Sequence, residues 1–180
     1  ADGTFDFKKG VLTNNGAATF SSTSGISLGD GATFDNNGTL KATSLTLNKG
    51  AKVSTDINTK DEEGKAVANY EVSTTTLNDG STFELKSLNS NQYLGFGNDK
   101  ETGKTYENDQ FLVTGVWNLN GGDLIYNGSA VEKLKIGKGG TNDKTTNVVT
   151  INADYSFGDI SFGQNGNLKV TEGKTLTVSN

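Results

Sequence analysis

The sequence contains no cysteine, methionine, histidine, proline or arginine, and all 16 of its cationic side chains are lysines. The absence of cysteine excludes disulfides and thiol chemistry, and it suits export through an oxidising compartment, where stray thiols mispair. The absence of histidine excludes a Ser-His-Asp triad and histidine-based zinc sites. These absences predict a protein that is not an enzyme. Because the chain also lacks methionine, we expect it to be a fragment of a longer secreted precursor.

Hydrophobic side chains are scarce as well, at 32% of the 180 residues, which is below the usual level for globular proteins. Threonine, asparagine and serine are abundant in their place, and glycine supplies a further 24 residues. No apolar run approaches the length needed to span a bilayer, so we expect no membrane insertion by this segment. The net charge of −5 disfavours nucleic acid as a partner, because phosphate binding needs clustered cations.

A short repeat organises the chain, and it is clearest in the stretch Leu45-Thr46-Leu47-Asn48-Lys49-Gly50-Ala51-Lys52-Val53. Apolar and polar residues alternate, a glycine follows at a corner, and an apolar residue returns three positions later. Further copies begin at Ile26, Thr75, Trp117 and Leu168, and Leu134 with Ile136 carries the first half. We expect Trp117 to pack in the core, because it stands at an inward position of this repeat. Helical periodicity is nearly absent, so the pattern predicts an all-β protein.

Two architectures produce short alternating strands that end at glycine: an antiparallel sandwich and a β-solenoid. The spacing of equivalent residues favours the solenoid, because Leu28 and Leu47, and again Leu119 and Ile136, are separated by about one solenoid period of roughly 20 residues. The longer interval between Leu77 and Leu119 is interpreted as two such periods. We therefore predict a single solenoid domain over residues 1–180, with about eight or nine turns stacked about 4.8 Å apart.

Three polar segments depart from the repeat: residues 56–70, 96–110 and 137–147. In a solenoid, such insertions leave the rod at corners and often line a binding face. The predicted binding residues are charged or aromatic side chains in or beside the first two insertions: Asp61, Glu62, Glu63, Tyr70, Tyr93 and Tyr106.

No cofactor is predicted, although calcium is a candidate ligand because aspartate and asparagine recur at turns such as Asp30-Gly31 and Asp35-Asn36-Asn37-Gly38. No EF-hand and no nine-residue calcium repeat is present, and capping of turns by these side chains is the favoured explanation. Hydrolysis of glycosides by paired carboxylates also stays open, but nothing in the sequence pairs two carboxylates across a cleft.

The repeats Gly31-Ala32-Thr33-Phe34-Asp35-Asn36-Asn37-Gly38 and Gly166-Asn167-Leu168-Lys169-Val170-Thr171-Glu172-Gly173 resemble those of passenger domains of Gram-negative autotransporters and related secreted β-helical adhesins. The likeness is compositional and covers most of the chain. It implies a right-handed parallel β-helix with loop insertions, export through the outer membrane, and a role in adhesion and virulence at the cell surface.

The sequence thus predicts a secreted, non-enzymatic module of the bacterial cell surface that acts in adhesion or self-association. Its expected partners are a host or bacterial surface glycan or protein, or a second copy of itself. The alternative prediction is a surface-layer or matrix protein that assembles into a lattice, with or without calcium.

Overall fold

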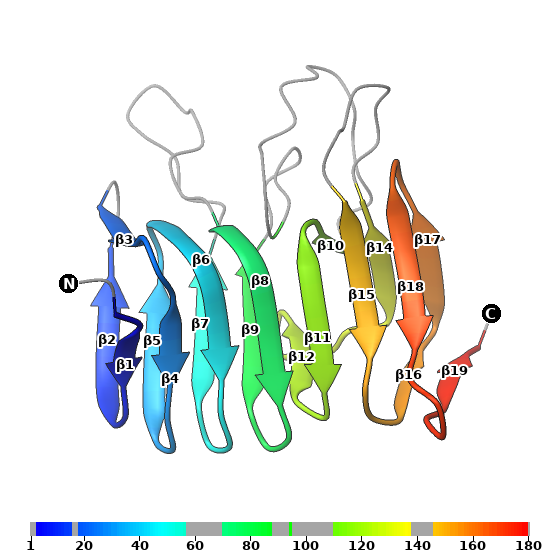
Figure 1. Ribbon diagram of the computed structural model, residues 1–180, viewed down its shortest axis with the longest axis horizontal. Helices are drawn as coiled ribbons and strands as arrows, with labels where there is room; N and C mark the ends of the chain where they lie inside the picture. The colour runs from blue at the N-terminus through cyan, green and yellow to red at the C-terminus, as the bar shows by residue number, and fades with distance from the viewer. Residues whose placement is uncertain are drawn as a thin grey trace.

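The computed structural model describes residues 3–15, 18–56, 70–87, 94, 110–137 and 146–179, and these residues form β-strands without a helix. The molecule is elongated, and the chain progresses along its long axis from the N-terminal strands at one end to the C-terminal strands at the other (Figure 1). The search of these residues for a helix able to cross a membrane found none. The prediction of an all-β protein is confirmed.

The strands form four sheets. The first sheet contains β1 (Phe5–Phe7), β3 (Thr19–Ser22), β4 (Ile26–Leu28), β6 (Thr39–Leu47), β8 (Tyr70–Asn78), β11 (Val116–Asn120), β15 (Asn147–Ile151) and β18 (Gly166–Val170). The second sheet contains β2 (Gly10–Asn14), β5 (Ala32–Asn36), β7 (Lys52–Asp56), β9 (Thr82–Ser87), β12 (Asp123–Tyr126) and β13 (Ser129–Ala130). The third sheet contains β10 (Gln110–Val113), β14 (Lys133–Ile136) and β17 (Asp159–Phe162). The fourth contains β16 (Tyr155–Phe157) and β19 (Leu176–Val178).

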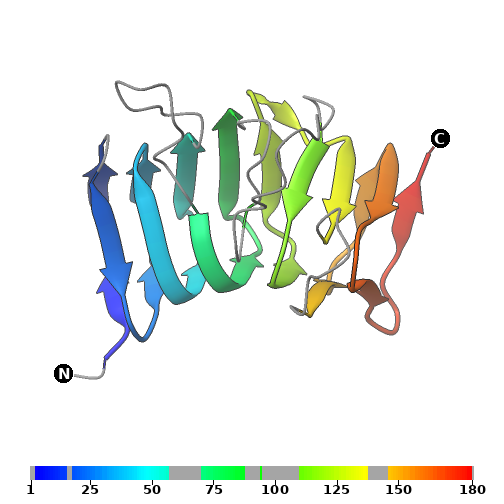
Figure 2. The same cartoon turned by 90° about the horizontal axis from the view of Figure 1, so that it is seen from above.

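Parallel pairing dominates, and it places equivalent residues of the repeat side by side. In the first sheet, one continuous register row runs through Phe7, Leu28, Leu47, Leu77, Leu119, Ile151 and Val170. A second row, two residues earlier in each strand, runs through Phe5, Ile26, Leu45, Thr75, Trp117, Val149 and Leu168. Seen from above, the sheets lie around a common interior (Figure 2). This pairing is compatible with the predicted solenoid.

The core lies inside these sheets and is built from the alternate residues of each strand. In β4 and β6, Ile26, Leu28, Leu45 and Leu47 are buried, whereas Ser27 and Thr46 between them are only half-buried. Trp117 is fully buried, as the repeat predicts. Its ring centroid lies 5.3 Å from that of Phe83 and 5.9 Å from that of Phe111, both in edge-to-face geometry. Such pairs add to the stabilisation from apolar burial.

The structure corrects the assignment of Leu134 and Ile136 as a copy of the main repeat. They belong to β14 in the third sheet, where they pair with Phe111 and Val113 of β10. The residue that follows Leu119 in its register row is Ile151. Leu77 and Leu119 are direct partners, so the long interval between them is one step along the row and not two. Apolar alternation indicates which residues of a strand face the core, but it does not indicate which sheet the strand joins.

A β-hairpin interrupts the parallel arrangement of the second sheet. β12 pairs antiparallel with β13, with Tyr126 opposite Ser129. The two residues of the loop, Asn127 and Gly128, have φ values of 48° and 80°, as a type I′ turn requires. β13 ends the second sheet, and β16 pairs with β19 in a separate sheet.

Candidate functional site

The predicted binding residues fall into two groups. Asp61, Glu62, Glu63, Tyr93 and Tyr106 lie outside the described residues. Tyr70 is described, and its placement corrects the prediction: it is 1% exposed, and its hydroxyl lies 2.7 Å from Thr75 Oγ1. Tyr70 is the first residue of β8, where the inward alternation takes it into the core. Its ring is therefore not available to a surface ligand.

The outer face of the first sheet carries a regular row of small polar side chains. This polar row consists of Ser27, Thr46, Thr76, Asn118 and Thr150, which are register partners on successive strands. All five side chains are half-buried, and Asn118 Nδ2 donates a hydrogen bond to Thr76 Oγ1 at 3.2 Å. Because in-register strands lie about 4.8 Å apart, the row presents hydroxyl and amide groups at an even spacing.

An asparagine ladder runs parallel to the polar row at the C-terminal ends of β6, β8, β11 and β15. The side-chain amide of Asn78 donates to Asn48 Oδ1 at 3.0 Å, and Asn120 donates to Asn78 Oδ1 at 2.9 Å. Asn152 then donates to Asn120 Oδ1 at 2.7 Å. Each inner amide is thus donor to one neighbour and acceptor from the other, which holds successive turns in register.

The outer face of the second sheet carries ion pairs. Lys52 Nζ lies 2.8 Å from Glu84, and Lys86 Nζ lies 2.9 Å from Asp35. Between them Ser54 is 5% exposed, and its hydroxyl has no hydrogen-bond partner among the described residues. Asp35, a calcium candidate in the sequence, is therefore engaged with a lysine.

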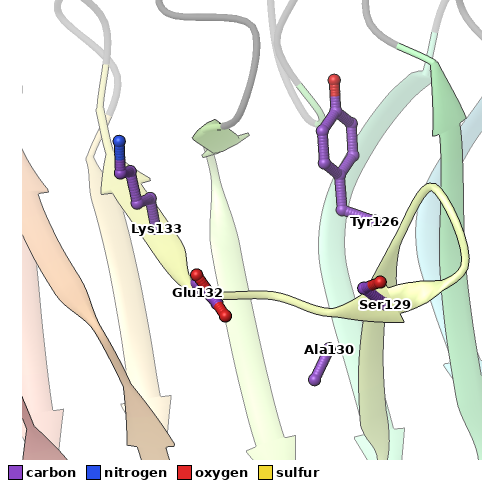
Figure 3. A pocket seen from close by; sticks show the side chains of 5 residues that line it. All are labelled: Tyr126, Ser129, Ala130, Glu132 and Lys133. Carbon is purple, nitrogen blue, oxygen red and sulfur yellow. The ribbon is translucent and has the colours of Figure 1, made fainter.

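A hollow of about 260 Å³ lies beside the β12–β13 hairpin. Tyr126 of β12 and Lys133 of β14 stand on opposite sides of it, with Glu132 between them and Ser129 and Ala130 along the hairpin (Figure 3). An aromatic ring, a carboxylate and an ammonium group around one hollow can contact a small polar ligand. Tyr126 was not among the predicted binding residues, because it lies in none of the three insertions. The pattern that could have located this hollow is Asn127-Gly128, a strong hairpin signal that interrupts the repeat.

Tyr155 is the remaining tyrosine with a polar role in the described structure. Its hydroxyl accepts a hydrogen bond from the Gly121 N–H at 3.0 Å and donates to the Gly122 carbonyl at 2.7 Å. Burial raises the pKa of Tyr155 to about 12, against the effect of the Gly121 hydrogen bond, and the charges of Asp123 and Asp79 raise it further. The phenol therefore stays protonated at neutral pH and clamps the turn between β11 and β12.

The described residues hold no group of three or more acidic, histidine or cysteine side chains able to bind a metal ion. Comparisons of the chain with models of protein families, with curated proteins and with solved structures found no match. The candidate functional surfaces are therefore defined by the geometry alone: the polar row and the hollow beside the hairpin.

Proposed function

We propose that the chain is a right-handed parallel β-solenoid with loop insertions, and that it serves as a non-enzymatic adhesion or self-association module of a secreted bacterial surface protein. The polar row is the observation that carries the proposal. It is long, regular and built from side chains whose hydroxyl and amide groups bind glycans and polar protein surfaces without chemistry of their own.

The chemistry of the chain supports a binding role. The sequence has no histidine or cysteine to act as base or nucleophile. Among the described tyrosines, Tyr70 packs in the core and the hydroxyl of Tyr155 holds the turn between β11 and β12. The side chains that repeat along the molecule and are accessible to a partner are those of the outer faces. This arrangement favours recognition of an extended partner over catalysis on a small substrate.

The proposal is tested by coating beads with the purified chain and measuring their retention on cultured epithelial cells and on a second set of coated beads. The variant Thr46→Glu with Asn118→Glu places two carboxylates in the polar row, on either side of Thr76. We expect it to reduce retention by more than half, because the added carboxylates are strongly hydrated and would lose that water on contact with a partner.

The matched control is Thr33→Glu with Thr82→Glu on the outer face of the second sheet. These residues flank Lys52 in register, so the variant adds the same charge at the same spacing on another face, and we expect it to retain binding. Equal loss in both variants would show that net charge, and not the polar row, controls retention. If beads coated with the unmodified chain bind neither cells nor each other, the proposed function is wrong.

A further inference from the structure

The hollow beside the β12–β13 hairpin lies where the parallel arrangement of the second sheet is interrupted. β13 has only two residues, Ser129 and Ala130, and both are exposed. The chain returns to the interior directly afterwards, because Val131 is 6% exposed and its N–H donates a hydrogen bond to the Leu124 carbonyl at 3.0 Å. β13 thus buries little apolar surface, and its two residues instead form one wall of the hollow.

Backbone hydrogen bonds hold the other walls of the hollow in place. The N–H of Asn127, in the hairpin loop, donates to the Leu85 carbonyl at 2.8 Å, and the Glu132 carbonyl accepts a hydrogen bond from the Asp159 N–H at 3.0 Å. Lys133 begins β14, which pairs with β10 on one side and with β17 on the other. Because the lining residues lie on or between paired strands, the hollow is formed before any ligand arrives.

Three different kinds of side chain surround the hollow. Tyr126 is half-buried and packs against the core, so its ring is a fixed surface. Glu132 is exposed and Lys133 is half-buried. Tyr126 and Lys133 extend in the same direction from opposite sides of the hollow, with Glu132 between them (Figure 3). The hollow therefore offers an aromatic surface, a hydrogen-bond acceptor and a hydrogen-bond donor to one ligand.

We propose that this hollow binds one neutral sugar ring. The apolar C–H face of the ring lies on Tyr126, while the sugar hydroxyls donate to the Glu132 carboxylate and accept from the Lys133 ammonium group. The site is separate from the polar row, because its lining residues belong to the second and third sheets or to the segment that joins them. The inference therefore goes beyond the proposed function and does not depend on it.

The charges around the hollow favour a neutral ligand. Glu132 repels anions and Lys133 repels cations, so neither sign of charge is attracted overall. An apolar ligand fits poorly as well, because it would strip water from both charged groups without replacing their hydrogen bonds. A zwitterion such as a free amino acid can pair with both, but an ion pair at the exposed Glu132 contributes little and leaves the aromatic surface unused. A sugar ring engages all three side chains.

The size of the hollow agrees with a single ring. Its volume is about 260 Å³, just below the range of roughly 300–1,000 Å³ that is typical of pockets for drug-sized ligands. A hollow of this size accommodates one ring with its hydroxyl groups. In a longer glycan, the further units would lie outside the hollow in solvent.

The test titrates the purified, isotope-labelled 180-residue chain with the methyl glycosides of glucose, galactose, mannose and N-acetylglucosamine, and follows the backbone amide signals by NMR. We expect at least one glycoside to bind in the millimolar range and to shift the signals of Ser129, Ala130 and Glu132. Tyr126→Ala is expected to weaken binding roughly tenfold or more, because the aromatic surface is lost. Tyr126→Phe keeps the ring, and we expect it to bind within about twofold of the unmodified chain.

Glu132→Gln is the second variant, and we expect it to fold like the unmodified chain because the Glu132 side chain is exposed. It is expected to weaken binding roughly three- to tenfold, because hydrogen bonds to a charged acceptor are the stronger ones. Glu172→Gln is the matched control, since it makes the same change at an exposed glutamate that does not line the hollow. We expect this control to bind like the unmodified chain.

Binding that Tyr126→Ala and Glu132→Gln both leave unchanged would place the sugar elsewhere on the chain and overturn the proposal. Absence of binding by every glycoside would also overturn it, as would binding of free glycine or glutamate at the hollow in place of the glycosides. The polar-row variant Thr46→Glu with Asn118→Glu is expected to bind the glycosides normally. A chain that is retained on cells but binds no glycoside would therefore overturn the sugar site alone and leave the proposed function standing.

Discussion

At the scale of single residues, hydrogen-bonded side-chain amides supply stabilisation that a larger apolar core supplies in other proteins. Asn36 is buried, and its amide donates to Thr55 Oγ1 at 3.0 Å, while Asn14 Nδ2 donates to Asn36 Oδ1 at 2.9 Å. Buried amides are tolerated because their neighbours in adjacent strands satisfy them. A narrow interior flanked by such ladders explains how a chain with 32% hydrophobic residues folds.

The asparagine ladder gives the first prediction. Asn78→Ala removes the donor to Asn48 Oδ1 and the acceptor of Asn120 Nδ2, and both partners are half-buried. We expect the free energy of unfolding to fall by about 1–2 kcal/mol, because two polar groups lose their partners. Urea unfolding followed by circular dichroism measures the change.

Asn167→Ala is the control for this prediction. Asn167 is exposed, and its amide donates to the nearby Asn165 carbonyl at 2.9 Å. We expect a change within about 0.5 kcal/mol of zero. If Asn78→Ala is as harmless as Asn167→Ala, the ladder does not stabilise the fold.

Tyr155 gives a prediction about pH. Its pKa is raised from 10.0 to about 12 in the folded protein, so the unfolded chain releases the phenolic proton first as the pH rises. The stabilisation from the neutral phenol is therefore complete below pH 10 and is lost progressively toward pH 12. In Tyr155→Phe, we expect a smaller fall in stability over this range than in the unmodified protein.

The measurement is urea unfolding of both proteins at intervals between pH 8 and pH 12, a range set around the ordinary and raised pKa values of Tyr155. The two proteins differ only at position 155, so the difference between the two curves isolates Tyr155. Parallel curves would show that the phenol has no raised pKa in the folded state.

At the scale of elements, the close approach of successive strands depends on particular glycines. Gly115 has a φ of 75°, and a Cβ at this position would lie 2.7 Å from the Ser73 carbonyl oxygen. Its N–H also donates to Asn147 Oδ1 at 2.9 Å. We expect Gly115→Ala to destabilise the protein by about 2 kcal/mol or more, because left-handed strain adds to a clash with backbone.

Thermal unfolding of Gly115→Ala measures this cost, with Gly3→Ala as the control. A Cβ on Gly3 meets no atom within 4 Å, so we expect Gly3→Ala to unfold like the unmodified protein. Equal melting temperatures for the two variants would mean that Ser73 of β8 does not approach Gly115 as described.

Sequence patterns predicted the elements of the first sheet well, because strand alternation and corner glycines leave a strong local signal. Ile26 with Leu28, Leu45 with Leu47, Trp117 with Leu119 and Leu168 with Val170 occupy equivalent positions in the two register rows, and the first six of these residues are buried. Two things escaped prediction. The third sheet uses the same alternation, so Leu134 and Ile136 could not be told apart from the main repeat. Tyr70 was assigned to an insertion, although its spacing from Val72, also buried, already continued the inward pattern of β8.

The candidate functional surfaces were harder to predict from the sequence than the strands of the first sheet. Five of the six predicted binding residues lie outside the described residues, and the prediction for them stands untested. The polar row depends on which strands are neighbours, and pairing of distant strands leaves no local pattern. Thr46 and Asn118 are far apart in the sequence, for example, and are related only through their shared register partner Thr76.

At the scale of the whole molecule, each strand of the first sheet pairs with its counterpart one repeat away, whatever the length of chain between them. Thr46 and Thr76 are partners across residues 57–69, and Thr76 and Asn118 are partners across residues 88–109. The polar row and the proposed solenoid both follow from this register.

Disulfide trapping tests this register directly, because the chain has no cysteine of its own. In-register strands place Cα atoms about 4.8 Å apart, within the range for a disulfide, whereas strands two apart are separated by about 9.6 Å, beyond it. Thr46→Cys with Thr76→Cys is therefore expected to form an intramolecular disulfide on mild oxidation, detected by mass spectrometry of the monomer. Thr46→Cys with Asn118→Cys is expected to stay reduced. A disulfide in the second variant and none in the first would contradict the parallel register on which the proposals rest.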